Sequence, residues 1–123
     1  MENNGTLYDL AFLKKFTNND PQKVERYIQT YLRTSERIFA ELEEAGAHGS
    51  WEDAYTKAHT VKPQVQYMGI ASLLELIMEI ENKAKADPGS TSLSELVGRA
   101  AQVYKKSSIE LMTYLQETSQ VDR

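Results

Sequence analysis

A long seam of mostly apolar residues with helical spacing is the feature that most restricts how this chain can fold. The seam steps alternately by four and three residues and consists of Val24, Ile28, Tyr31, Ser35, Ile38, Leu42 and Ala45. Such steps place side chains on one face of an α-helix. Asp20 and Pro21 supply a capping carboxylate and a proline at the first helical position, and Gly46 is the expected stop. The pattern predicts a bundle helix of roughly seven turns.

Apolar residues with the same periodicity predict four more helices, at residues 7–16, 51–69, 70–86 and 93–117. Thr6 and Ser50 are the expected N-caps of the first two of these helices. No sustained period-2 alternation indicates a strand. Four long helices joined by short loops pack most simply as an antiparallel up-down four-helix bundle, with the short first helix at one end. With 123 residues, we expect one all-α domain, 1–123, whose core spans about residues 7–117.

The composition narrows the classes of function. The formal net charge is −4, which disfavours nucleic acid and anionic membrane surfaces as partners. The chain has no cysteine, so disulfides, thiolate metal sites and cysteine nucleophiles are excluded. The first residues lack the pattern of a signal peptide, and no apolar run approaches the ~20 residues of a membrane span. A cytoplasmic location is the resulting expectation.

His59 lies in the middle of the helix predicted at residues 51–69, away from the apolar stripe of that helix. The stripe consists of Ala54, Ala58, Val61, Val65 and Met68. At about 100° per residue, His59 points roughly 140° from the centre of this stripe. The neighbours of His59 on the helix surface are Tyr55, Lys62, Pro63 and Gln66. We therefore expect an exposed histidine beside a cation.

An exposed imidazole beside an ammonium group is suited to carrying a phosphoryl group. Much of an imidazole population is neutral near pH 7, so a ring nitrogen can act as a nucleophile without a strong base. Lys62 can donate charge-assisted hydrogen bonds to phosphoryl oxygens, and Gln66 is a second candidate donor. The alternative is an ordinary solvated lysine beside a surface histidine. The sequence contains no phosphate-binding loop, nucleotide-binding motif, metal-ligand set or hydrolase motif.

The residues around His59 resemble the motif of histidine-containing phosphotransfer (HPt) domains. The family pattern is A-H-x-L-K-G, then five residues of which the last is apolar, then glycine. The matching positions, in register and without a gap, are Ala58, His59, Val61, Lys62, Met68 and Gly69. Val61 replaces the usual leucine, and Pro63 stands where the family has glycine. The order and lengths of the predicted helices are also similar to the family over about residues 7–117, although only this motif is residue-specific.

The resemblance implies a phosphocarrier rather than an enzyme. His59 would exchange a phosphoryl group with the aspartate of response-regulator receiver domains in a two-component phosphorelay. Lys62 would stabilise the phosphoryl group and Gln66 could hydrogen-bond to it. The candidate positions for binding the partner are Tyr55, Pro63 and Gly69. The expected partners are receiver domains and a hybrid sensor kinase. The chain would be a monomer without a cofactor of its own, because the receiver supplies a Mg ion.

Pro63 leaves two questions open. A proline inside a helix costs ~3 kcal/mol or more, so the helix either kinks after His59, which we favour, or ends near Val61 and restarts at Pro63. A proline in place of glycine also changes how a partner can approach. A helical adaptor that docks a receiver or another helical partner without phosphotransfer is therefore the alternative function, and a homodimer is a third possibility.

Several apolar residues have a predicted location that depends on the packing of the helices. Tyr27, Tyr31 and Phe39 of the longest predicted seam are mostly core residues by their spacing. Leu7, Leu10 and Phe12 either belong to the core or form an apolar docking patch near His59, and the sequence does not separate these uses.

Overall fold

The computed structural model describes residues 5–121, and every regular element in this range is an α-helix. The helices are α1 (Ala11–Phe16), α2 (Pro21–Ala47), α3 (Trp51–Tyr67), α4 (Ala71–Ala86) and α5 (Leu93–Val121). The predicted all-α fold is therefore confirmed, and residues 1–4 and 122–123 of the expected single domain lie outside the described range. No helix between residues 5 and 121 is long and apolar enough to cross a membrane.

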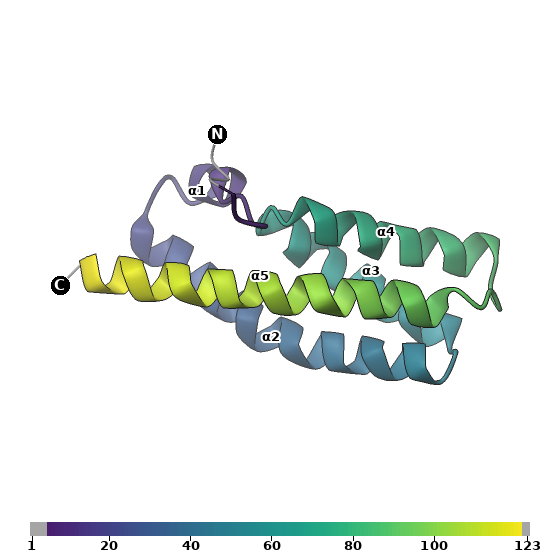
Figure 1. The fold of residues 1–123 in the computed structure, drawn as a ribbon. Coiled ribbons are helices and arrows are strands. Elements are labelled where there is room, and N and C mark those ends of the chain that lie inside the picture. The colour runs from purple at the N-terminus through teal and green to yellow at the C-terminus, as the bar shows by residue number, and fades with distance from the viewer. Residues whose placement is uncertain (1–4, 122–123) are drawn as a thin grey trace.

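The four long helices form an antiparallel up-down bundle, as predicted (Figure 1). Each long helix packs mainly against two others, so that α3 contacts α2 and α4, and α5 also contacts α2 and α4. This arrangement places α3 and α5 diagonally opposite each other. The short helix α1 lies at the end of the bundle where α2 begins and α5 ends (Figure 1).

The core follows the predicted seams. All five residues of the apolar stripe of α3 are buried, and so are Ile28, Leu42 and Phe39 on α2. Burial of apolar side chains at about 25 cal/mol per Å² is the main favourable term in holding such a bundle together. Tyr31 also lies in the core, whereas Tyr27 is 43% exposed, so its predicted core location is wrong. The reason is that Tyr27 precedes the buried Ile28 by one residue and faces α1 instead.

The start of α2 matches its prediction, but its end does not. The Asp20 carboxylate accepts hydrogen bonds from the amides of Gln22 and Lys23 at 3.0 and 3.4 Å, and Pro21 is the first helical residue. Gly46 is not the stop, because α2 continues through Ala47. A Cβ at Gly46 would be 3.0 Å from the side chain of Val97 on α5. Gly46 therefore allows a close approach of two helices rather than a left-handed cap.

The first helix begins four residues later than predicted. Residues 7–10 are not helical, and the Thr6 hydroxyl bonds to the Tyr8 carbonyl instead of capping a helix. The Asp9 carboxylate accepts a hydrogen bond from the Ala11 amide at 3.0 Å. The backbone amide of Asp9 donates a hydrogen bond to the Met68 carbonyl at 3.3 Å. This segment lies along the turn after α3 because its backbone bonds to that turn.

The central helix α3 runs without interruption through Pro63 to Tyr67. The alternative in which it ends near Val61 and restarts is wrong. Ser50 caps α3 as predicted, since its hydroxyl accepts a hydrogen bond from the Asp53 amide at 3.4 Å. Burial of Val61 before the proline and Val65 after it explains why the helix continues in phase despite the missing amide.

Candidate functional site

His59 lies on the outer face of α3, and 62% of its side chain is exposed, as predicted. Its ring stacks on Tyr55, one turn earlier, with ring centroids 5.7 Å apart and an interplanar angle of 11°. The ammonium group of Lys85, on α4, lies 5.5 Å from the centroid of the Tyr55 ring. Stacking limits the rotation of the imidazole, while most of the side chain remains open to solvent.

A buried carboxylate from α4 links the two residues that the sequence singled out. Glu81 is only 7% exposed. One of its oxygens, Oε2, is 2.8 Å from His59 Nδ1, and the other, Oε1, is 2.8 Å from Lys62 Nζ. A single carboxylate therefore fixes the imidazole and the ammonium group side by side across the α3–α4 interface.

The charge state of Glu81 determines the tautomer of His59. Burial raises the pKa of Glu81, but hydrogen bonds from Lys62 and His59 together with their charges outweigh this effect, so the pKa lies below its ordinary value. The carboxylate is thus ionised at neutral pH and can only accept hydrogen bonds. His59 Nδ1 must then carry a proton and donate a hydrogen bond to Glu81. In the neutral ring, the free lone pair is then on Nε2.

Glu81 was not identified from the sequence as a residue of the candidate site. It follows Ile77 by four residues and Ile80 by one, so it continues the buried stripe of α4. A carboxylate in such a position needs a partner, because an unpaired buried charge is costly. That mismatch was the available signal, but the partner lies 22 residues away on the preceding helix and could not be named without the packing of α3 on α4.

Gln66 and Pro63 lie farther along the exposed face of α3. Together with Phe12 and Tyr67 they line a hollow of about 420 Å³. Among the residues that the structure describes, no hydrogen bond joins the Gln66 side chain to His59 or Lys62. Gln66 therefore belongs to the surface beside the histidine rather than to the hydrogen-bonded group around it.

Four exposed aromatic rings continue this surface, and we call them the aromatic surface. They are Phe12 and Phe16 of α1, Tyr27 of α2 and Tyr67 of α3, which are 39–54% exposed. Their ring centroids form a chain of contacts between 5.4 and 6.2 Å. A contiguous apolar patch of this kind on a protein surface commonly marks an interaction site. Leu7, Leu10 and Phe12 were the residues considered for such a patch, and only Phe12 belongs to it. Leu10 is buried in the core, and Leu7 packs against the core.

Gly69 has a structural task at the end of α3. Its φ of +63° lies in the left-handed region that favours glycine, and a Cβ there would overlap the carbonyl oxygen of Asp9. The glycine of the motif thus lets the N-terminal segment cross the turn closely. Its geometry is explained by backbone packing without a direct contact to His59.

Nothing in residues 5–121 forms a group of three or more histidine, cysteine or acidic side chains that could hold a metal ion. Comparisons of the chain with protein-family models, curated proteins and solved structures give no significant match. The functional argument therefore depends on the geometry around His59.

Proposed function

We propose that the protein is a phosphorelay intermediate, similar to an HPt domain, that carries a phosphoryl group on His59 Nε2. The observation that carries the proposal is the Glu81 carboxylate, which bonds His59 Nδ1 and Lys62 Nζ at 2.8 Å each. This arrangement presents a lone pair at the exposed nitrogen and holds a cation beside it. An ordinary surface histidine needs neither feature.

The transfer step follows from these contacts. The Nε2 lone pair attacks the phosphorus of an aspartyl phosphate on the partner, and the bond from phosphorus to the aspartate oxygen breaks, returning its electron pair to that carboxylate. The ring becomes a cationic phosphoimidazolium, whose Nδ1 proton stays in the hydrogen bond to ionised Glu81. Lys62 uses one ammonium proton on Glu81 and keeps two for phosphoryl oxygens. The reverse reaction returns the phosphoryl group.

The partner in this proposal is a response-regulator receiver domain, possessing the acceptor aspartate and the Mg ion that phosphoryl transfer requires. The aromatic surface supports a protein partner, because it begins at the hollow beside Pro63 and Gln66 on the His59 face of α3. Such a protein would act in the cytoplasm, where receiver domains are found.

A non-transferring adaptor is the second candidate, and Pro63 is the observation that favours it. Pro63 is exposed between His59 and the aromatic surface, so its ring stands where a partner must approach. An adaptor would use the same surface but would not need the tautomer that Glu81 imposes.

The test is transfer of label from radiolabelled, phosphorylated receiver domains. We expect acid-labile, alkali-stable label on the wild-type protein and none on His59→Gln. His48→Gln is the matched control, because His48 is the only other histidine of the chain and bonds to the Glu44 carbonyl. Label on His48→Gln but not on His59→Gln assigns the site.

Glu81→Gln separates the carrier from the adaptor. A neutral amide cannot balance the charge of the phosphoimidazolium. It also places an NH2 donor where one of the two acceptor oxygens of Glu81 stands, so one of the contacts to His59 and Lys62 is lost. Transfer should therefore slow by at least about ten-fold. Binding of the receiver should persist. If no member of a panel of receivers labels the wild-type protein, and Pro63→Gly is not labelled either, the carrier proposal is wrong and the adaptor is preferred.

A further inference from the structure

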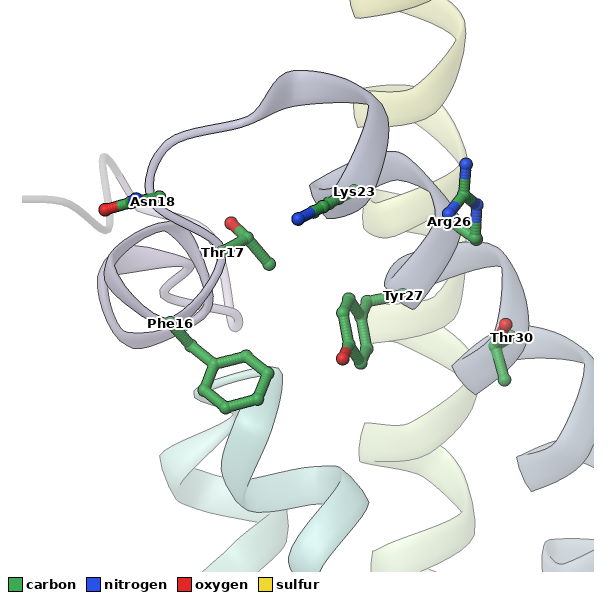
Figure 2. Close-up of a pocket in the computed structure, with 7 residues that line it drawn as sticks. All are labelled: Phe16, Thr17, Asn18, Lys23, Arg26, Tyr27 and Thr30. Carbon is green, nitrogen blue, oxygen red and sulfur yellow. The ribbon is translucent and has the colours of Figure 1, made fainter.

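A basic hollow of about 540 Å³ opens between the end of α1 and the first turns of α2. Its lining residues are Phe16, Thr17, Asn18, Lys23, Arg26, Tyr27 and Thr30. Figure 2 shows the Lys23 side chain extending toward Thr17, on one side of the space that the rings of Phe16 and Tyr27 border, with Arg26 pointing outward from α2. The hollow therefore combines two cations with two aromatic rings, and none of its lining residues is acidic.

The two cations have no acidic partner within the described part of the chain. None of its ion pairs includes Lys23 or Arg26. Glu25 is the acidic residue nearest in sequence to both cations, but it lies near Tyr114 of α5, where burial and the charge of Glu25 raise the pKa of that tyrosine. The Asp20 carboxylate caps α2. In a chain with a net charge of −4, this hollow is a local excess of positive charge. Cations without partners beside exposed rings are suited to a carboxylate on a docked protein.

The basic hollow is continuous with the surface around His59. Phe16 lines the hollow and also contacts Tyr67, which lines the second hollow beside Pro63. Tyr67 lies eight residues after His59, which is about 12 Å along α3. A standard protein interface buries about 800 Å² on each partner. One docked domain can therefore cover His59, the aromatic surface and the basic hollow together.

We propose that the basic hollow anchors the receiver partner by binding a carboxylate side chain that is flanked by an apolar residue. The carboxylate pairs with Lys23 and Arg26, and the apolar side chain packs on Phe16 and Tyr27. Attachment at this hollow and at the aromatic surface fixes the orientation in which the receiver aspartate faces His59. The inference rests on the proposed phosphotransfer role and adds a rule of partner choice, because a receiver without the carboxylate loses the anchor.

The experiment measures binding of unphosphorylated receiver domains, at low and at high salt, to a double variant with Lys23→Glu and Arg26→Glu. Both residues are exposed, and acidic residues in the first turns of α2 suit the helix dipole, so the variant should fold. The matched control replaces Arg99 and Lys106, two exposed cations of α5, with glutamate and changes the net charge equally. Since α5 lies diagonally across the bundle from α3, this control leaves the proposed docking face intact.

We expect the double variant to bind cognate receivers at least about ten-fold more weakly at low salt, with a smaller difference at high salt. The control should stay within about two-fold of the wild-type protein. Phe16→Ala should also weaken binding, without the salt dependence. Equal binding by the double variant, an equal loss in the control, or no binding of any receiver to the wild-type protein overturns the inference.

Failure of this inference can be told apart from failure of the proposed function. Phosphoramidate, a small donor that needs no docking, should phosphorylate His59 equally in the wild-type protein and in both charge variants. If receivers transfer to the double variant at an unchanged rate, the phosphocarrier proposal is supported and the basic hollow is not a receiver-binding site. If binding depends on Lys23 and Arg26 but no transfer occurs, the basic hollow is a receiver-binding site and the phosphocarrier proposal is wrong.

Discussion

At the scale of single residues, the candidate site depends on one carboxylate that serves two neighbours at once. Glu81 fixes the proton of His59 on Nδ1 and holds Lys62 beside the ring, with both contacts at 2.8 Å. An exposed histidine alone would sample both tautomers and several rotamers. The contribution of the buried glutamate is therefore selection of one state in advance of the reaction, which lowers the cost of reaching a productive geometry.

The lowered pKa of Glu81 predicts how stability depends on pH. A carboxyl group whose folded pKa is lowered contributes stability above its unfolded value of about 4.3, and this contribution is lost as the pH falls through the folded pKa. The difference in unfolding free energy between the wild-type protein and Glu81→Gln should therefore shrink as the pH falls below about 4.3. Urea unfolding at a series of pH values measures it.

Glu79→Gln provides the baseline for this series, because it removes an exposed carboxylate of α4 that takes part in no ion pair between residues 5 and 121. Effects of other acidic residues such as Glu41 cancel, since they are present in all three proteins. A difference between wild type and Glu81→Gln that stays constant or grows as the pH falls would contradict the assigned ion pair.

At the scale of elements, the turn after α3 and the segment before α1 determine each other's position. The Asp9 amide donates to the Met68 carbonyl at 3.3 Å, and the Asp9 carbonyl occupies the space that a Cβ at residue 69 would need. This contact places α1, and with it Phe12 and Phe16, beside Tyr67 of α3. The aromatic surface thus depends on a backbone crossing that contains no aromatic residue.

Gly69→Ala should destabilise the protein by roughly 2–4 kcal/mol. About 1–2 kcal/mol comes from a left-handed conformation at a residue with a Cβ, and the rest from displacing the Asp9 carbonyl. Gly49→Ala is the control, because Gly49 has a similar φ of +68° with nothing within 4 Å of an added Cβ. Chemical unfolding of both variants measures the two terms. Equal losses in the two variants would show that the crossing contributes nothing.

The ends of the helices show what local sequence can predict and what it cannot. Asp20 and Pro21 act on the backbone within their own turn, so the start of α2 was predictable. Gly46 stands where a glycine would be expected to end a helix, but the structure uses it to leave room for the Val97 side chain of α5. The late start of α1 likewise depends on Met68, nearly 60 residues away in the chain. Contacts between distant segments decide these cases.

At the scale of the whole molecule, the bundle itself was predictable, because apolar seams with helical periodicity and short loops leave few ways to pack four long helices. The exposure of His59 followed from its angle to the stripe of α3. The pairing of Glu81 with His59 did not, since it requires the axial offset of α4 against α3. The aromatic surface was only partly predictable, because Tyr27 sits next to a buried seam and its exposure depends on where α1 lies.

The distribution of charge over the whole molecule predicts a monomer. A two-fold dimer through the aromatic surface would place the same patch of both copies face to face. Lys23 and Arg26 line the basic hollow that Phe16 and Tyr27 of this patch also line, so each copy would bring like charges against its partner. The exposed Ile109 and Met112 lie on another face, in a groove between α2 and α5 that is interrupted by Arg33, Glu36 and Lys105.

Sedimentation equilibrium over a roughly hundred-fold range of protein concentration tests this expectation. A constant mass of 14.0 kDa supports the monomer. A mass that rises toward twice this value would contradict it, and two variants then identify the face. Loss of association in Phe16→Asp would assign the aromatic surface to self-association and remove it from the receiver, whereas loss in Ile109→Asp would leave His59 and the basic hollow free for a partner.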